Sequence, residues 1–115
     1  MNFFSSLIGE PVPTLTVMEL QEKLQNGKQP FLLDVRQPEE FHLSHISGAK
    51  LIPLGELGQR IEEMPLDREI VCICATGNRS MSAVLILKKA GYTARSVKNG
   101  MTAWQMANLP IKKGV

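Results

Sequence analysis

An apolar segment that leads through a glycine-containing loop straight into a helix is the feature that most constrains this fold. Residues 69–74 have the character of a buried strand, residues 74–80 (CATGNRS) form the loop, and residues 81–90 have the apolar content of a helix. A strand that ends in such a turn leaves several backbone N–H groups unpaired and aimed at one point. The pattern therefore predicts an anion-binding loop at the end of a central strand.

The rest of the chain repeats this alternation of strands and helices. Strands are predicted at residues 31–35, 49–52 and 93–97, and helices at residues 16–27, 39–43, 54–64 and 101–107. The first of these helices opens with Thr16 and, three residues later, Glu19, which is the spacing of a capping box. Strands that alternate with helices over short connections predict an α/β fold, with a small, mostly parallel sheet flanked by helices on both faces.

The length of 115 residues is enough for one domain with its own core. We expect that domain at residues 14–111, with an N-terminal tail at 1–13 that packs on it and a C-terminal tail at 112–115. The start is apolar but has neither a basic segment nor a cleavage site, so it does not read as a signal peptide. No stretch approaches the roughly 18 to 20 apolar residues that span a membrane, and no membrane association is expected.

The two cysteines differ in their surroundings. Cys74 opens the loop, where Arg79 and the start of the helix favour a thiolate with a pKa below the ordinary value of about 8.5. The alternative for a cysteine at the end of a buried strand is an inert core residue, and Cys72, in the middle of the strand, fits that alternative. No second cysteine pair or adjacent histidine completes a zinc site, so neither metal nor cofactor is expected. A free reactive thiol suits a reducing compartment, and the cytoplasm is the default expectation.

Charge is unevenly distributed along the sequence. All eleven acidic residues lie at or before Glu69, whereas seven of the thirteen basic residues follow it. One interpretation is a positive field that attracts small anionic substrates to Cys74. The other is that the two halves interleave in an α/β fold, so that no charged patch results. The basic residues are dispersed and not interleaved with aromatic ones, which argues against nucleic-acid binding.

Three local motifs, in this order, carry a family resemblance: residues 34–49 (DVRQPEEFHLSHISGA), the loop at 74–80, and residues 99–104 (NGMTAW) followed by Leu109-Pro110. Together they resemble the rhodanese homology domain of the sulfurtransferase family over roughly residues 14–111. Ser44, Asn99 and Asn108 stand where the family pattern has glycine. Asparagine tolerates the left-handed backbone conformation, so two of these departures preserve the expected geometry; the effect of Ser44 stays open.

The resemblance implies a rhodanese-like fold and a thiosulfate sulfurtransferase-like enzyme of a single domain. The Cys74 nucleophile would take sulfane sulfur from a small anionic donor, such as thiosulfate or a low-molecular-weight persulfide, and pass it from a persulfide to cyanide or a thiol. The backbone of the loop would stabilise the sulfur anion; its residues are Ala75, Thr76, Gly77, Asn78, Arg79 and Ser80. Asp34 and Arg36 would support the site, and His45 would be structural.

Alternatives remain at three points. The sequence supports a second reading as a sulfur-relay or partner-binding module that has little small-molecule turnover and passes sulfur to a protein acceptor. Phosphatase or arsenate reductase chemistry is disfavoured, because related dual-specificity phosphatases need the spacing C-x5-R whereas Cys74 and Arg79 give C-x4-R. Arg79 itself either binds the donor or pairs with a carboxylate and braces the loop, and bracing is slightly favoured.

Overall fold

Five short parallel strands form one sheet in the computed structural model, which describes residues 11–115. The strand order is β1-β5-β4-β2-β3. The strands are β1 (Thr14–Leu15), β2 (Phe31–Asp34), β3 (Lys50–Leu51), β4 (Ile70–Ile73) and β5 (Ala94–Val97). The central strand β4 is apolar and buried along its whole length, as expected for a parallel strand that is covered on both faces.

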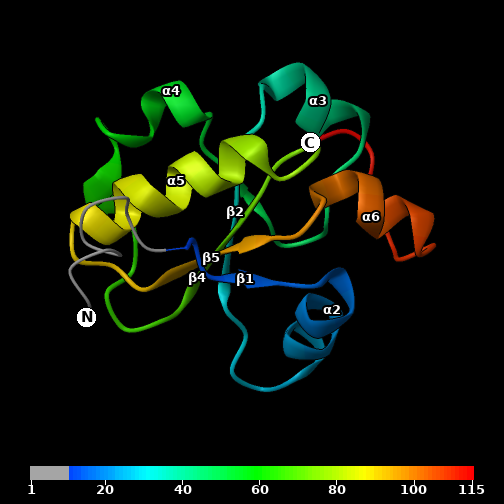
Figure 1. Ribbon diagram of the computed structural model, residues 1–115. Coiled ribbons are helices and arrows are strands. Elements are labelled where there is room, and N and C mark those ends of the chain that lie inside the picture. The colour runs from blue at the N-terminus through cyan, green and yellow to red at the C-terminus, as the bar shows by residue number, and fades with distance from the viewer. Residues whose placement is uncertain (1–10) are drawn as a thin grey trace.

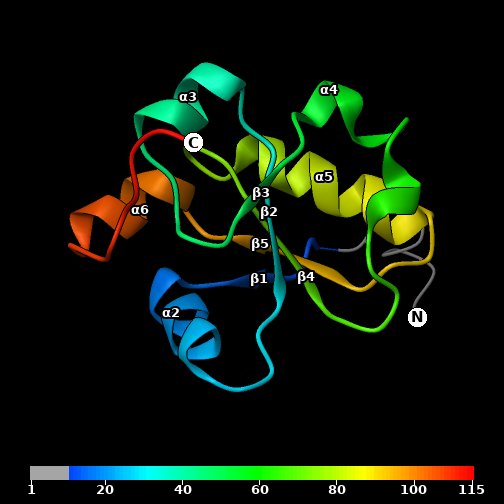
Figure 2. The ribbon, with the colours of Figure 1, turned by 180° about the vertical axis from the view of Figure 1, so that it is seen from behind.

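Helices cover both faces of this sheet (Figure 1 and Figure 2). They are α2 (Val17–Gln25), α3 (Pro38–Leu43), α4 (Leu54–Leu57), α5 (Asn78–Lys89) and α6 (Gly100–Met106), with a 3-10 turn η1 (Ile61–Glu63) after α4. Leu33 and its neighbours pack with α4 and α5 in one core cluster, and Leu32 packs with α2 and α6 in a second. Successive strand residues point to opposite faces, so the two clusters lie on opposite sides of the sheet. The predicted α/β fold is confirmed.

Most of the predicted elements are present, with one correction and one omission. The capping box of α2 forms, with Thr16 Oγ1 accepting from the Glu19 N–H at 3.1 Å. The single helix predicted at residues 54–64 is wrong, because α4 ends at Leu57 and only the short η1 follows. Gly55 and Gly58 explain the break, since glycine is a poor helix former. Strand β1 was not predicted. The N-terminal tail was expected at residues 1–13, and residues 1–10 of it lie outside the described residues.

The three departures from the family's glycines have simple backbone explanations. Asn99 and Asn108 adopt left-handed conformations, with φ of 58° and 56°, which confirms the expectation for asparagine. Ser44 follows α3 in an extended conformation with φ of −168°, which any residue can adopt. Glycine is therefore not required at position 44.

Ion pairs join the acidic and basic halves of the sequence. Arg79 pairs with Glu40 at 2.7 Å and Arg95 pairs with Glu69 at 2.9 Å. Each pair brings a basic residue of the second half onto an acidic residue of the first. Interleaving of the halves in the fold thus neutralises part of the positive charge that follows Glu69.

The chain connections diverge at the carboxyl ends of β2 and β4. These strands are neighbours, yet the chain continues from β2 to β3 on one side and from β4 to β5 on the other. Ligand sites of open parallel sheets form where successive connections diverge in this way. Asp34 ends β2 and Cys74 follows β4, so both lie at this position. In the described part of the chain no helix has the length and apolar character needed to cross a membrane.

The first turn of α6 is fixed directly to the end of β4. The backbone N–H groups of Met101 and Thr102 donate to the carbonyl oxygens of Cys74 and Ala75 at 2.8 and 3.0 Å. Gly100 makes this approach possible, because a Cβ atom there would collide with the Cys74 carbonyl group, and its φ of 46° is left-handed. Helix α6 therefore holds the start of the loop through backbone hydrogen bonds, and this close approach requires glycine at position 100.

We expect Gly100→Ala to lower the free energy of unfolding by about 2–4 kcal/mol, because it combines left-handed strain with overlap against backbone that cannot move aside. Urea denaturation measures the loss. Gly27→Ala is the matched control, since a Cβ atom there would meet no other atom within 4 Å. Equal stability of the two variants would show that α6 does not need this close approach.

Candidate active site

The Cys74 sulfur lies inside the loop that joins β4 to α5. Its Sγ accepts the backbone N–H groups of Gly77 at 3.1 Å and Ser80 at 3.3 Å, and lies 3.5 Å from the Ser80 hydroxyl oxygen. Gly77, at the N-cap of α5, has φ of 103°, and this left-handed conformation curls the loop around the sulfur. Cys74 is only 1% exposed, so the surrounding residues restrict the access of a reactant to Sγ.

These hydrogen bonds control the acidity of Cys74. Burial opposes ionisation, but the Ser80 hydroxyl and the backbone N–H groups of Ser80, Gly77 and Thr76 outweigh it and hold the pKa of Cys74 below its ordinary value. The loop therefore favours the thiolate, which is the nucleophilic form of the side chain.

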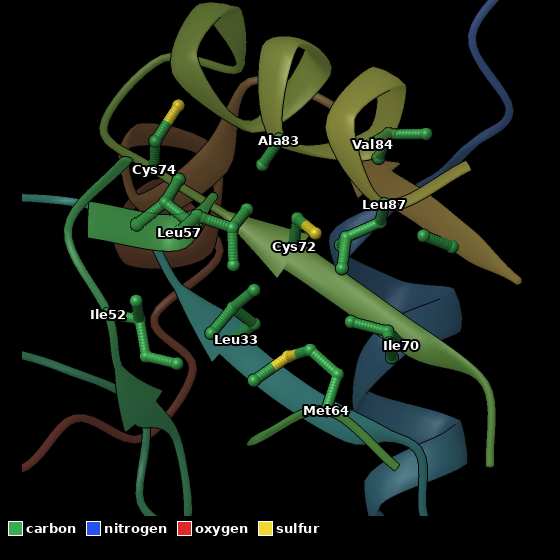
Figure 3. Close-up of a cluster of buried hydrophobic side chains, with 12 residues drawn as sticks. Leu33, Ile52, Leu57, Met64, Ile70, Cys72, Cys74, Ala83, Val84 and Leu87 are labelled. Carbon is green, nitrogen blue, oxygen red and sulfur yellow. The ribbon is translucent and has the colours of Figure 1, made fainter. Parts of the chain in front are cut away.

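Cys72 lies two residues earlier in a very different environment. It is fully buried in the core cluster on the α5 face, and burial, followed by the proximity of Cys74, raises the pKa of Cys72 to about 12. Figure 3 shows Cys72 among the labelled aliphatic side chains, whereas Cys74 lies at the margin of the cluster with its sulfur turned away from them. The geometry gives the two thiols opposite character.

Arg79 forms a bidentate ion pair with Glu40 of α3. Its Nη1 and Nη2 atoms donate to Oε1 and Oε2 of Glu40 in α3 at 2.7 and 2.9 Å. The Arg79 guanidinium, with help from the Gln37 backbone N–H and against the effect of partial burial, lowers the pKa of Glu40 to about 2. Both side chains are 35% exposed, so solvent weakens the pair without removing it. The pair ties the loop to α3.

Asp34 and Arg36 form a second, buried pair at the end of β2. Arg36 Nη2 lies 2.7 Å from Asp34 Oδ2, and its Nε donates to Oδ1 at 3.0 Å. The same guanidinium donates to the carbonyl oxygens of Glu40 and Ser44 at 3.3 and 2.7 Å. Arg36 thus fixes both ends of the last turn of α3, and through α3 the carboxylate that holds Arg79.

The remaining candidates lie around this core of the site. His45 is buried, stacks on Phe41 with ring centroids 3.7 Å apart, and shares a 2.8 Å hydrogen bond with the Phe41 carbonyl oxygen. Asn78 begins α5. Beside the loop lies an open groove of about 530 Å³ that Thr76 and Met106 help to line. Within residues 11–115, no three His, Cys, Asp or Glu side chains are grouped so that they could hold a metal ion.

Three residues of this region were not among the sequence candidates. Glu40 holds Arg79, Gly100 admits α6 beneath the loop, and the buried Ser96 of β5 lies 2.7 Å from the Ser80 hydroxyl. Glu40 had a weak signal, because it follows Gln37 at capping-box spacing. Gly100 lies in the motif at residues 99–104, which marks its position but not its contact with Cys74, and a lone serine in a strand carries no signal.

Comparison with known proteins agrees with this geometry. The family model described as "Rhodanese-like domain" matches residues 16–107. "Probable adenylyltransferase/sulfurtransferase MoeZ" of Mycobacterium tuberculosis is 42% identical over 79% of this chain, and the chain spans only 24% of that protein. "Thiosulfate sulfurtransferase GlpE" of Vibrio cholerae is 32% identical over 79% of this chain and 87% of the relative.

A solved structure shows the same fold. The crystal structure of a rhodanese-related protein from Thermoplasma volcanium has a TM-score of 0.81 and 29% sequence identity, and the match covers 87% of this chain and 97% of that one. The family model covers most of the chain and the solved structure has the same fold, so the chain belongs to the rhodanese-like domain family.

Proposed function

We propose that this protein is a sulfurtransferase that carries sulfane sulfur as a persulfide on Cys74. Sulfur transfer is the general activity that the family and the names of the relatives support. The single observation that carries the proposal is the set of N–H groups aimed at a sulfur atom whose pKa they lower. The two free thiols suit a reducing compartment, and we propose the cytoplasm.

In the first half-reaction, the Cys74 thiolate would attack the outer sulfur of thiosulfate. A bond forms between Sγ and that sulfur, the sulfur–sulfur bond of thiosulfate breaks, and sulfite leaves with the electron pair. The loop lowers the pKa of Cys74 and so favours the thiolate, and a molecule in that form needs no general base to attack. The near-complete burial of Cys74 favours a donor with an exposed terminal sulfur, since a small terminal atom approaches a buried Sγ more easily than a bulky group does.

In the second half-reaction, cyanide or a thiolate would attack the outer sulfur of the persulfide. The new bond takes the sulfur to the acceptor, and the electron pair of the broken bond returns to Cys74 as a thiolate. The loop N–H groups lie where this negative charge develops, so they stabilise the leaving group as well as the starting nucleophile. The same arrangement serves both halves of the reaction.

A sulfur relay to a protein acceptor is the second candidate. The groove beside the loop is lined by Thr76, Asn99, Thr102, Ala103, Met106 and Ala107. None of these side chains is charged, and Met106 is 80% exposed. Such a surface suits the approach of a protein or peptide acceptor better than that of a small anion.

For Arg79 we propose bracing of the loop. Both nitrogen atoms at the end of its guanidinium group are already bonded to Glu40. The carboxylate of Glu40 also neutralises the charge with which Arg79 would attract an anionic donor, whereas bracing uses the contacts as they stand. Asp34 and Arg36 would then support the site indirectly, through the position of α3.

Cys74→Ala should abolish cyanide-dependent release of thiocyanate from thiosulfate, because it removes the nucleophile. Cys72→Ala should retain turnover of the same order, since that thiol lies in the core and remains protonated. Colorimetric thiocyanate assays of both variants, with circular dichroism to verify folding, make the comparison. Equal losses in the two variants would contradict this division of roles.

The ultraviolet absorbance of the thiolate should titrate with a midpoint below the ordinary thiol pKa of about 8.5. Because the folded-state pKa is lowered, Cys74 stays ionised as the pH falls below that value and is protonated only at the lower midpoint. Subtracting the curve of Cys74→Ala isolates the signal, and absorbance needs no reagent to reach a buried sulfur. A midpoint at or above about 8.5 would contradict an activating loop.

Glu40→Gln should lower stability at pH 7 by about 1 kcal/mol, a value reduced for the partial exposure of the pair. The folded pKa of Glu40 is depressed, so its stabilisation is complete above the ordinary value of 4.5 and is lost as the pH falls toward about 2. Urea denaturation at several pH values should therefore show the difference from wild type shrinking over this interval. Glu39→Gln, the same change on the neighbouring residue, is the control.

The same variant tests the role of Arg79. If Arg79 braces the loop, Glu40→Gln should lower kcat and leave the KM for thiosulfate unchanged or higher. A fall in KM would show instead that the released guanidinium binds the donor.

A further inference from the structure

Two serine hydroxyl groups form a buried chain behind the reactive sulfur. Ser80, in the first turn of α5, and Ser96, in β5, are 0% and 1% exposed, and their Oγ atoms lie 2.7 Å apart. Ser80 Oγ also lies 3.5 Å from Cys74 Sγ and 3.0 Å from the Gly77 carbonyl oxygen. Ser80 is thus surrounded by three possible partners.

Ser80 has a single hydroxyl proton to distribute among these partners. In the thiol form, Cys74 can donate its proton to Ser80 Oγ, which in turn donates to the Gly77 carbonyl oxygen. In the thiolate form, the sulfur has only lone pairs, so Ser80 can stabilise it only by turning its proton toward Sγ. A Ser80 proton given to Ser96 would leave the thiolate without this donor.

The surroundings of Ser96 decide the direction of the bond between the serines. Across residues 11–115, the hydroxyl group of Ser96 has one hydrogen-bond partner, which is Ser80 Oγ. A buried hydroxyl proton that points at no acceptor costs free energy, so the Ser96 proton points at Ser80. Ser80 then keeps its own proton for the sulfur or for Gly77.

We propose that Ser96 is a positioning residue that donates to Ser80 and so orients the Ser80 hydroxyl proton toward the Cys74 thiolate. When Cys74 ionises, its proton leaves to solvent, the Ser80 proton turns from the Gly77 carbonyl to Sγ, and the bond from Ser96 satisfies the Ser80 oxygen. Aligned hydroxyl groups polarise one another, which strengthens the bond to the anion. The inference rests on the proposed role of Cys74 as a thiolate.

A double-mutant cycle with Ser80→Ala tests the proposal, with the thiolate absorbance titration as the readout. Ser96→Ala should lower the acid dissociation constant of Cys74 by about three- to ten-fold, which is the effect of one hydrogen bond. In the Ser80→Ala background, the same substitution should cause no further change, because Ser96 acts only through Ser80. Ser96→Thr, which keeps the hydroxyl group, should restore the wild-type midpoint.

Val17→Ala controls for a general loss of stability. Val17 is buried in α2 and packs in the core cluster of the opposite face, so its truncation should destabilise the fold and leave the Cys74 titration unchanged. An unchanged midpoint in Ser96→Ala, or an equal shift with and without Ser80, would overturn the proposal.

The outcome separates this inference from the proposed function. If Cys74 forms the persulfide normally but the titration midpoint of Ser96→Ala equals that of the wild type, only the role of Ser96 is rejected. A coupled shift in a protein that never forms the persulfide would reject only the sulfurtransferase function.

Discussion

The competition between burial and hydrogen bonding at Cys74 Sγ is the interaction on which the site depends. Removing a thiol from water raises its pKa, and this is the main cause of the raised pKa of Cys72, two residues away. At Cys74 the Ser80 hydroxyl and the N–H groups of the loop together reverse it. Strand β4 therefore holds an inert thiol and the loop that follows it holds an ionisable one, and the difference is produced by the seven residues from Cys74 to Ser80.

Three contacts from distant parts of the chain hold the loop in the shape that achieves this. The first turn of α6 binds the carbonyl groups of Cys74 and Ala75, Glu40 holds Arg79 on the outer side, and Ser96 holds Ser80 from the sheet. Without these contacts the loop would change its conformation, because its N–H groups would turn to water or to other hydrogen-bond acceptors instead of converging on one sulfur atom. The surrounding fold thus preorganises the anion site before any substrate arrives.

The local structure around Cys74 could be predicted from the sequence, whereas the long-range contacts that hold the loop could not. The strand, loop and helix around Cys74 are contiguous, so their pattern could be interpreted directly, and the spacing of Cys74 and Arg79 could be counted. Glu40 lies 39 positions from Arg79, and no local pattern indicates that the two meet. The interrupted helix after Leu54 shows that two glycines can outweigh a helical apolar pattern. Strand β1 is too short to show any period.

Mass spectrometry of the Cys74 peptide after exposure of the reduced protein to thiosulfate or glutathione persulfide tests the central claim most directly. We expect the peptide to gain the mass of one sulfur atom, to lose it on addition of cyanide, and to keep Cys72 unmodified throughout, although the two residues are separated by one position. An unmodified Cys74 with both donors, in a protein that is folded and reduced, would contradict sulfur transfer through this residue.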